Sequence, residues 1–127
     1  LYIADCWNHR VQLFRANQAD GTTVAGNSSK VTTISLLCPV AVALDAKGFL
    51  FISDRWKHRI VGSDINGFRC IVGCNGSFLL APNSLNSPTS FGFDTDGNIR
   101  VLDAGHSRIQ KFLLNSNQSC SMFHPSP

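Results

Sequence analysis

The chain has 127 residues, of which 43% are hydrophobic and 15% are charged, and its formal net charge is +3. This apolar content is sufficient for a folded core and excludes a disordered chain, while the mild, scattered positive charge argues against a nucleic-acid-binding surface. All 8 acidic residues are Asp, only one Met occurs, and Ser, Thr, Asn and Gly are common, so the composition favours strands and turns over long helices. No apolar run approaches the length that spans a bilayer, so we expect no membrane segment in this part of the protein.

An internal repeat organises the sequence, with three segments that align without gaps at 1–11, 50–60 and 99–109. An Asp followed five residues later by an Arg marks each segment, and both recur at intervals of 49: Asp5 and Arg10, Asp54 and Arg59, Asp103 and Arg108. Ahead of the second and third segments, a Pro, an Asp and a Gly keep the same register: Pro39 and Pro88, Asp45 and Asp94, Gly48 and Gly97. Recurrence at so many positions predicts a repeat architecture.

Taken in chain order, the first unit (1–26) begins at the second strand of the pattern, and the middle unit (39–73) contains all four strands. Residues 40–45 follow a Pro and are apolar, as expected of a buried innermost strand. Lys47-Gly48 makes a tight turn into a second strand at 49–54, a third strand begins near Arg59, and a fourth covers 67–73. The third unit (88–123) follows the same order, and we expect its outer strand to fray from residue 116.

Four short antiparallel strands per unit are typical of a β-propeller blade. The order Pro, apolar strand, Asp, Gly, apolar strand, Asp and then Asn-His-Arg-Ile resembles the NHL repeat, with local versions at 8–11, 57–60 and 106–109. The resemblance covers almost the whole chain and implies an all-β partial propeller of about two and a half four-stranded blades. So few blades cannot close a ring, and Leu1 is not a natural start, so we expect the remaining blades to come from the same longer chain. The rival WD40 pattern lacks its Trp-Asp dipeptide here.

The repeated Asp and Arg are interpreted as structural, because catalysis needs a pair once whereas a fold device is needed in every unit. We expect the Asp that ends each second strand to hold the Arg that begins the third. His9 and His58 share one repeat position, but no Cys-x-x-Cys or His-x-x-x-His motif accompanies them, so no metal site is predicted. The stretch 94–98 resembles a calcium loop only faintly and is interpreted as a hairpin turn.

Two Trp residues at matching repeat positions are the main binding candidates. Trp7 and Trp56 fall where NHL repeats commonly carry a small residue, as Gly105 does here. Exposed aromatic side chains beside basic ones are enriched at binding hot spots, and four basic residues flank this pair: Arg10, Arg55, Lys57 and Arg59. We therefore hypothesise a binding surface at these positions. The alternative is that each ring lies flat over its own blade edge, stacked on the adjacent Arg.

Five cysteines occur, an odd number that leaves one over if the others pair. In a straight strand the side chains of Cys70 and Cys74 would be about 13 Å apart, too far for a disulfide, but a turn at Gly73 would bring them together. A bond from either of them to Cys120 stays open. The remaining two, Cys6 and Cys38, have no evident partners.

Three N-glycosylation sequons accompany these cysteines, at Asn27, Asn75 and Asn117. Together they favour an extracellular or secretory-pathway location, since disulfides persist in oxidising compartments. A cytoplasmic location is the alternative, and the sequence by itself leaves it open.

The leading functional interpretation is a non-catalytic scaffold without a cofactor, whose loops, including 74–88, present a variable surface to a protein or glycan partner. The NHL resemblance also implies two alternatives. The first is the substrate- or RNA-recognition module of tripartite-motif ubiquitin ligases, although no RING or B-box zinc pattern is present. The second is a lyase like the peptide-amidating enzyme, whose zinc-binding His residues should lie near innermost strands, yet 40–45 and 89–94 contain no His. No set of nucleophile, base and orienting residue is evident, so no enzyme is predicted.

Overall fold

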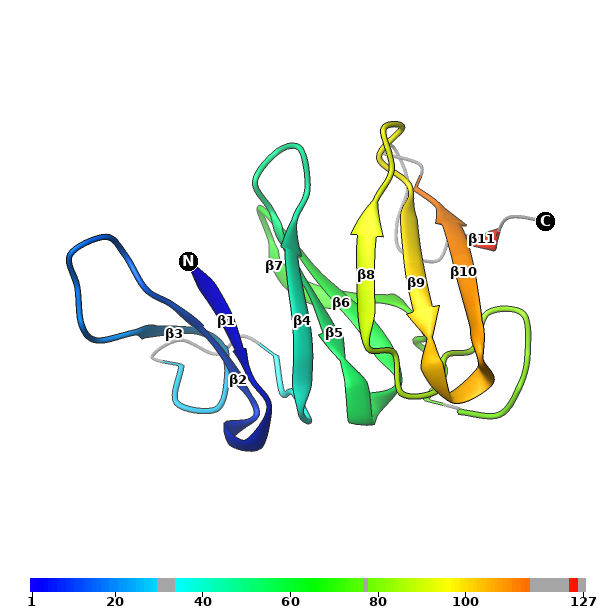
Figure 1. The fold of residues 1–127 in the computed structure, drawn as a ribbon, viewed down its shortest axis with the longest axis horizontal. Coiled ribbons are helices and arrows are strands. Elements are labelled where there is room, and N and C mark those ends of the chain that lie inside the picture. Colours follow the sequence, from blue (N-terminus) through cyan, green and yellow to red (C-terminus); the bar gives the residue numbers. More distant parts are fainter. Residues whose placement is uncertain (30–33, 77, 115–123, 126–127) are drawn as a thin grey trace.

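The computed structural model describes residues 1–29, 34–76, 78–114 and 124–125, which form three antiparallel sheets that follow one another along the chain (Figure 1). Sheet 1 contains β1 (Tyr2–Asp5), β2 (Arg10–Leu13) and β3 (Thr22–Gly26). Sheet 2 contains β4 (Pro39–Leu44), β5 (Leu50–Asp54), β6 (Arg59–Asp64) and β7 (Gly67–Val72). Sheet 3 contains β8 (Ser90–Phe93), β9 (Ile99–Asp103), β10 (Arg108–Leu113) and β11 (His124–Pro125). Strands that are consecutive in the chain are neighbours in each sheet.

The prediction of an all-β chain of short antiparallel strands is confirmed, and the described residues contain no α-helix. All four strands expected in the middle unit form: three begin and end within one residue of their predicted bounds, and the third begins at Arg59 as expected. The expected fraying of the third unit, at 116–123, lies outside the described residues. Within the described part of the chain, no helix is long and apolar enough to cross a membrane.

A single 3₁₀ turn joins the strand that ends at the repeated Asp to the strand that begins at the repeated Arg. These turns are η1 (Cys6–Asn8), η2 (Arg55–Lys57) and η3 (Ala104–His106). The residue after each turn has a left-handed backbone, with φ of 53° at His9, 55° at His58 and 53° at Ser107. All three turns lie at the lower edge of the sheets in Figure 1. The segments that lead into β4 and β8 end at this same edge, because β4 and β5, like β8 and β9, run antiparallel.

One prediction about burial is wrong. Residues 40–45 were expected to be the buried innermost strand, but in β4 only Pro39 is buried and Leu44 is exposed. The buried strand is β5, in which all five residues are buried. The physical reason is position within the sheet, because β4 is an edge strand of sheet 2 whereas β5 is an inner one with sheets packed on both faces.

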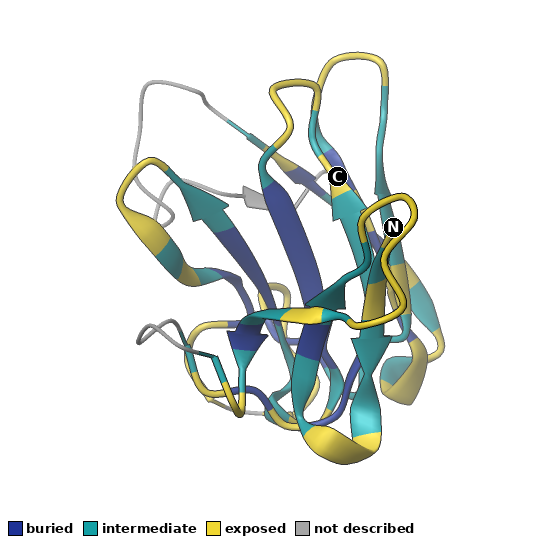
Figure 2. Cartoon of the chain, turned by 90° about the vertical axis from the view of Figure 1, so that its left-hand side faces the viewer, coloured by how far each residue is buried: buried dark blue, intermediate teal, exposed yellow. Residues whose placement is uncertain are grey.

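Two apolar layers hold the three sheets together, and Figure 2 shows the buried residues concentrated on the strands between them. Between sheets 1 and 2, Val11 packs with Leu50 and Ile52, whereas between sheets 2 and 3 Phe51 packs with Val101 and Phe112. Alternate side chains of β5 therefore enter opposite layers, as the period of two in a strand requires. The connecting segments contribute at equivalent positions, with Leu36 in the first layer and Leu85 in the second.

Sheet 3 differs from sheet 2 because only one of its faces is covered by a described element. Its strand β9 alternates strictly between buried and exposed residues. On the open face, Leu102 lies opposite Ile109 in the sheet register, and both are exposed, as is Leu113. In sheet 2 the residue equivalent to Ile109 is Ile60, which is fully buried against sheet 3. Arg100 and Lys111 lie on the same face, so sheet 3 presents exposed apolar side chains beside two basic ones where sheet 2 packs against its neighbour.

Candidate binding edge

The repeated Asp and Arg form an ion pair in each of the three sheets. Arg Nε lies 2.9 Å from the Asp oxygen in the pair Arg10 and Asp5, 2.8 Å in Arg59 and Asp54, and 2.7 Å in Arg108 and Asp103. The pair closes the base of each 3₁₀ turn, because the Asp precedes the turn and the Arg follows it. The side chains of Asp54 and Asp103 are fully buried, whereas that of Asp5 is 28% exposed.

The two buried carboxylates also hold the segment that enters their own sheet. Asp54 Oδ1 accepts a 2.7 Å hydrogen bond from Leu37 N–H, and Asp103 Oδ1 accepts an equal one from Asn86 N–H. Burial opposes ionisation of Asp103, but the hydrogen bonds from Asn86 and from neighbouring side chains outweigh it and keep the pKa of Asp103 below its ordinary 3.8. Each buried Asp therefore joins the turn, the third strand and the entering segment.

The two His residues at one repeat position link consecutive sheets. His9 Nδ1, in sheet 1, accepts a 2.9 Å hydrogen bond from Cys38 N–H at the entrance to sheet 2. His58 Nδ1, in sheet 2, accepts a 2.9 Å bond from Ser87 N–H at the entrance to sheet 3. Desolvation lowers the pKa of His58 below its ordinary 6.5; the Asp103 carboxylate raises it, and His106 lowers it further. Both Nδ1 atoms therefore act as hydrogen-bond acceptors between consecutive sheets.

Trp7 and Trp56 contact each other at the lower edge of sheets 1 and 2. Their ring centroids are 5.5 Å apart and the ring planes meet at 78°, an edge-to-face arrangement that aromatic pairs favour. Trp7 is 79% exposed and Trp56 is 38% exposed, so the pair projects into solvent. Leu37, whose carbonyl accepts a hydrogen bond from Trp56 N–H, is also exposed. We call these three side chains the tryptophan edge.

The four basic residues near the Trp pair differ in the hydrogen bonds and ion pairs that they make within the chain. Arg10 and Arg59 bind Asp5 and Asp54, and Arg59 Nη2 also donates to Ser35 O at 2.7 Å. Lys57 Nζ donates to Ser35 Oγ at 2.6 Å. Arg55 Nε is buried and has no hydrogen-bond partner among the described residues. Arg55 and Lys57 have no carboxylate partner within the described part of the chain, so the edge beside Trp56 carries uncompensated positive charge.

The cysteines form two disulfides, one of which the sequence analysis missed. Cys70 and Cys74 are bonded across a turn at Gly73, whose φ is 74°. Cys6 and Cys38, for which no partners were evident, are bonded to each other and so join η1 of sheet 1 to the segment entering sheet 2. This correction arises because the two cysteines are 32 residues apart and meet only when consecutive sheets pack. Cys120 lies outside the described residues.

The repeat period in the sequence also indicates these contacts. Sequential antiparallel strands bring each 3₁₀ turn and the segment entering a first strand to the same edge of the sheets. Positions 37 and 86 are 49 apart and are the ones that the buried Asp residues bind. Positions 38 and 87 are also 49 apart and are the ones that the two His residues bind, so each contact in one unit predicts its equivalent in the next.

Of the glycosylation candidates, Asn27 and Asn75 are exposed, and Asn117 lies outside the described residues. The stretch 94–98 forms a hairpin turn in which Asp94 Oδ1 accepts hydrogen bonds from Asp96 N–H and Asn98 N–H, each at 2.9 Å. Asp45 does the same at the equivalent turn, with Lys47 and Phe49 as donors. Among the described residues, no three His, Cys, Asp or Glu side chains are grouped so that they could hold a metal ion.

No protein-family model matches the sequence, and no curated protein matches it significantly.

Proposed function

We propose that the chain is part of an NHL-type β-propeller and that its sheets are consecutive blades. Support comes from the three meander sheets and from the Asp–Arg pair that closes the same turn in each of them. Further support comes from the exposed apolar side chains on the open face of sheet 3, because Ile109 lies where Ile60 of sheet 2 packs against its neighbour. We propose that another blade of the same longer protein covers this face.

We further propose that the protein is a non-catalytic binding scaffold that presents the tryptophan edge to a protein or glycan partner. The observation that carries this proposal is the exposed Trp7–Trp56 pair. Large aromatic side chains are costly to leave in water and are the residues most enriched at binding hot spots. The disulfide Cys6–Cys38 and the His9–Cys38 bond fix the loops that carry the pair, so little conformational entropy would be lost on binding.

We propose an extracellular or secretory-pathway location for this scaffold. Two disulfides fit an oxidising compartment, and the asparagines of two sequons, Asn27 and Asn75, are exposed. The alternative of RNA recognition gains little support, since Arg10 and Arg59 are paired with Asp5 and Asp54 within the chain.

The test is binding of the fluorescently labelled chain to intact cells and to a panel of immobilised glycans. Replacing Trp7 and Trp56 together by Ala should reduce saturable binding at least about tenfold, since hot-spot truncations cost about 2 kcal/mol or more. Ile65→Ala is the matched control, because Ile65 is 89% exposed and lies in the β6–β7 turn at the opposite edge of sheet 2. An equal loss of binding in the Ile65→Ala control, or unchanged binding in the Trp variant, would show that the tryptophan edge is not the binding surface.

A further inference from the structure

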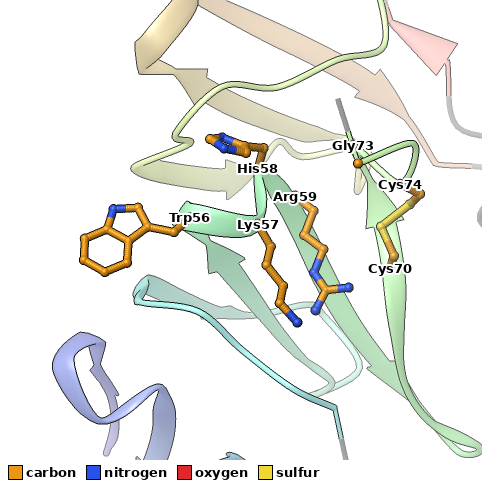
Figure 3. A pocket seen from close by; sticks show the side chains of 8 residues that line it. Trp56, Lys57, His58, Arg59, Cys70, Gly73 and Cys74 are labelled. Carbon is orange, nitrogen blue, oxygen red and sulfur yellow. A yellow bond between two sulfur atoms is a disulfide. The ribbon is translucent and has the colours of Figure 1, made fainter. Parts of the chain in front are cut away.

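A pocket of about 340 Å³ lies beside η2 (Figure 3). Residues 56–59 line one side, and Cys70, Gly73, Cys74 and Gly76 line the other. The described residues that line the pocket include no acidic one. Its size is at the lower end of the range for small-molecule sites, roughly 300–1,000 Å³, so it suits a single small ring rather than an extended ligand.

The positive wall of the pocket is held in place before any ligand arrives. Lys57 Nζ and Arg59 Nη2 both donate to Ser35, at 2.6 Å to its hydroxyl and 2.7 Å to its carbonyl oxygen. Arg59 shares its charge with Asp54, whereas Lys57 has no carboxylate partner in the described part of the chain. Lys57 is therefore the uncompensated cation of the pocket. Because Ser35 is an uncharged partner, the full positive charge of Lys57 remains available to an anion.

The opposite wall is rigid for a different reason. The disulfide between Cys70 and Cys74 closes the loop after β7, and Gly73 packs directly against the backbone of His58. A Cβ at Gly73 would overlap the His58 carbonyl oxygen, so the two walls are in contact at their base. A pocket with fixed walls loses little entropy when it binds a ligand.

The charge of this pocket is specific to sheet 2. The residues equivalent to Lys57 are Asn8 in sheet 1 and His106 in sheet 3. Asn8 is uncharged, and His106 uses both ring nitrogens, at 2.8 Å from Asp103 Oδ2 and 2.9 Å from Phe78 O. A cation that recurred in every sheet would indicate a device of the fold, and the non-recurrence of Lys57 means that no such common role accounts for it.

We propose that this pocket binds the carboxylate or sulfate group of an acidic sugar unit in a glycan. The inference rests on the proposed binding function and names the ligand class. A sugar ring matches the small volume, and its anionic group meets Lys57. The disulfides fit an oxidising, extracellular environment, where acidic glycans are abundant polyanions. Trp56 also lines the pocket, so the apolar face of a sugar ring can pack on its indole ring.

The experiment is an NMR titration of the ¹⁵N-labelled 127-residue chain with disulfides intact. The probes are methyl glucuronide and methyl N-acetylneuraminate, which carry a carboxylate, N-acetylglucosamine 6-sulfate, which carries a sulfate, and neutral N-acetylglucosamine. We expect at least one acidic sugar to shift the amide signals of Lys57, Gly73 and Cys74 and to bind about tenfold more tightly than the neutral one. The carboxylate and sulfate arms show which anionic group the pocket prefers.

Lys57→Gln removes a charged hydrogen bond and should weaken acidic-sugar binding about tenfold. Lys57→Arg keeps a charged donor and should retain most of the binding. Lys47→Gln is the matched control, because Lys47 is exposed in the β4–β5 turn at the opposite edge. Equal binding of neutral and acidic sugars, or no loss in Lys57→Gln, would overturn the proposal. Tighter binding of a capped aspartyl peptide would assign the pocket to a protein partner instead. Cell binding that depends on Trp7 and Trp56 but not on Lys57 would leave the proposed function standing while this inference fails.

Discussion

His58 accepts, through its ring Nδ1, a 2.9 Å hydrogen bond from the backbone N–H of Ser87. The bond joins the turn of sheet 2 to the segment that enters sheet 3, and His9 makes the same bond to Cys38 at the preceding junction. The backbone of His58 has a φ of 55°, so one residue both reverses the chain and reaches the next sheet. A ring nitrogen accepts a hydrogen bond only while it is unprotonated.

The junction between sheets 2 and 3 should therefore weaken in acid. The folded-state pKa of His58 lies below the ordinary value of 6.5 that applies when the chain is unfolded, chiefly because of burial, with Asp103 opposing and His106 adding to the decrease. As pH falls through 6.5 the unfolded chain takes up the proton first, so the free energy of unfolding decreases until pH drops below the folded-state pKa. Urea unfolding at pH 7.5 and pH 5 measures this change.

The control for this prediction is His58→Asn, because Asn tolerates a left-handed backbone and does not titrate in this range. The variant should be less stable at pH 7.5 and should lose part of the decrease between pH 7.5 and pH 5. The part that remains belongs to other titratable groups of the chain. A variant whose pH dependence equals that of the wild-type chain would contradict the assignment to His58.

The strands could be predicted from the sequence because their signals are local. Residues 49–52 are an apolar run, the stretch ends at the repeated Asp54, and Gly48 marks the turn before it, so β5 was predicted to within one residue. Burial of a whole strand is not a local property. β5 and β9 occupy equivalent repeat positions, yet β5 is buried throughout and β9 alternates, because a sheet packs on each face of β5 and on only one face of β9.

The candidate site was predictable only in part for the same reason. The matching positions of Trp7 and Trp56 placed both rings at one edge, but the edge-to-face contact between them depends on how two sheets pack. The Cys6–Cys38 disulfide and the Lys57–Ser35 contact likewise join residues that are far apart in sequence. Side chains that a sheet brings to one edge can be inferred from register, whereas distances across sheets require the packed structure.

The two disulfides should contribute unequally to stability. Cys6 and Cys38 are separated by 32 residues and Cys70 and Cys74 by only 4, and the loop-entropy cost that a crosslink removes from the unfolded chain grows with loop length. Replacing both cysteines of the longer loop by Ser should lower the free energy of unfolding by about 3–4 kcal/mol, compared with about 2 kcal/mol for the shorter one. Urea unfolding under non-reducing conditions measures both variants. An equal or reversed order would contradict the dependence of the stabilisation on loop length.

The Asp residues at equivalent positions offer a second matched comparison. Asp54→Ala leaves the N–H of Leu37 and the guanidinium of Arg59 without their acceptor in a buried site, so we expect a loss of about 3 kcal/mol. Asp5→Ala removes the equivalent pair with Arg10, which is partly exposed and screened by water, so the loss should be about 1 kcal/mol or less. Unfolding free energies of the two variants test this order. Similar losses would mean that the hydrogen bond to Leu37 N–H adds little.

Gly73 and Gly48 separate the cost of a left-handed backbone from the cost of crowding. Their φ angles are 74° and 86°, so Ala at either position is strained in its backbone. A Cβ at Gly48 would meet nothing within 4 Å, and Gly48→Ala should therefore cost only about 1 kcal/mol.

A Cβ at Gly73 would overlap the carbonyl oxygen of His58, part of the rigid backbone that precedes β6. Relief would require β6 and β7 to move apart, which breaks their hydrogen bonds and shifts the His58 ring away from Ser87. Gly73→Ala should then cost roughly 3 kcal/mol or more and, unlike Gly48→Ala, should change the amide signal of Ser87 in an NMR spectrum. Equal costs at the two positions would mean that the loop after β7 is free to move away from His58, and the rigid wall argued for the pocket would not exist.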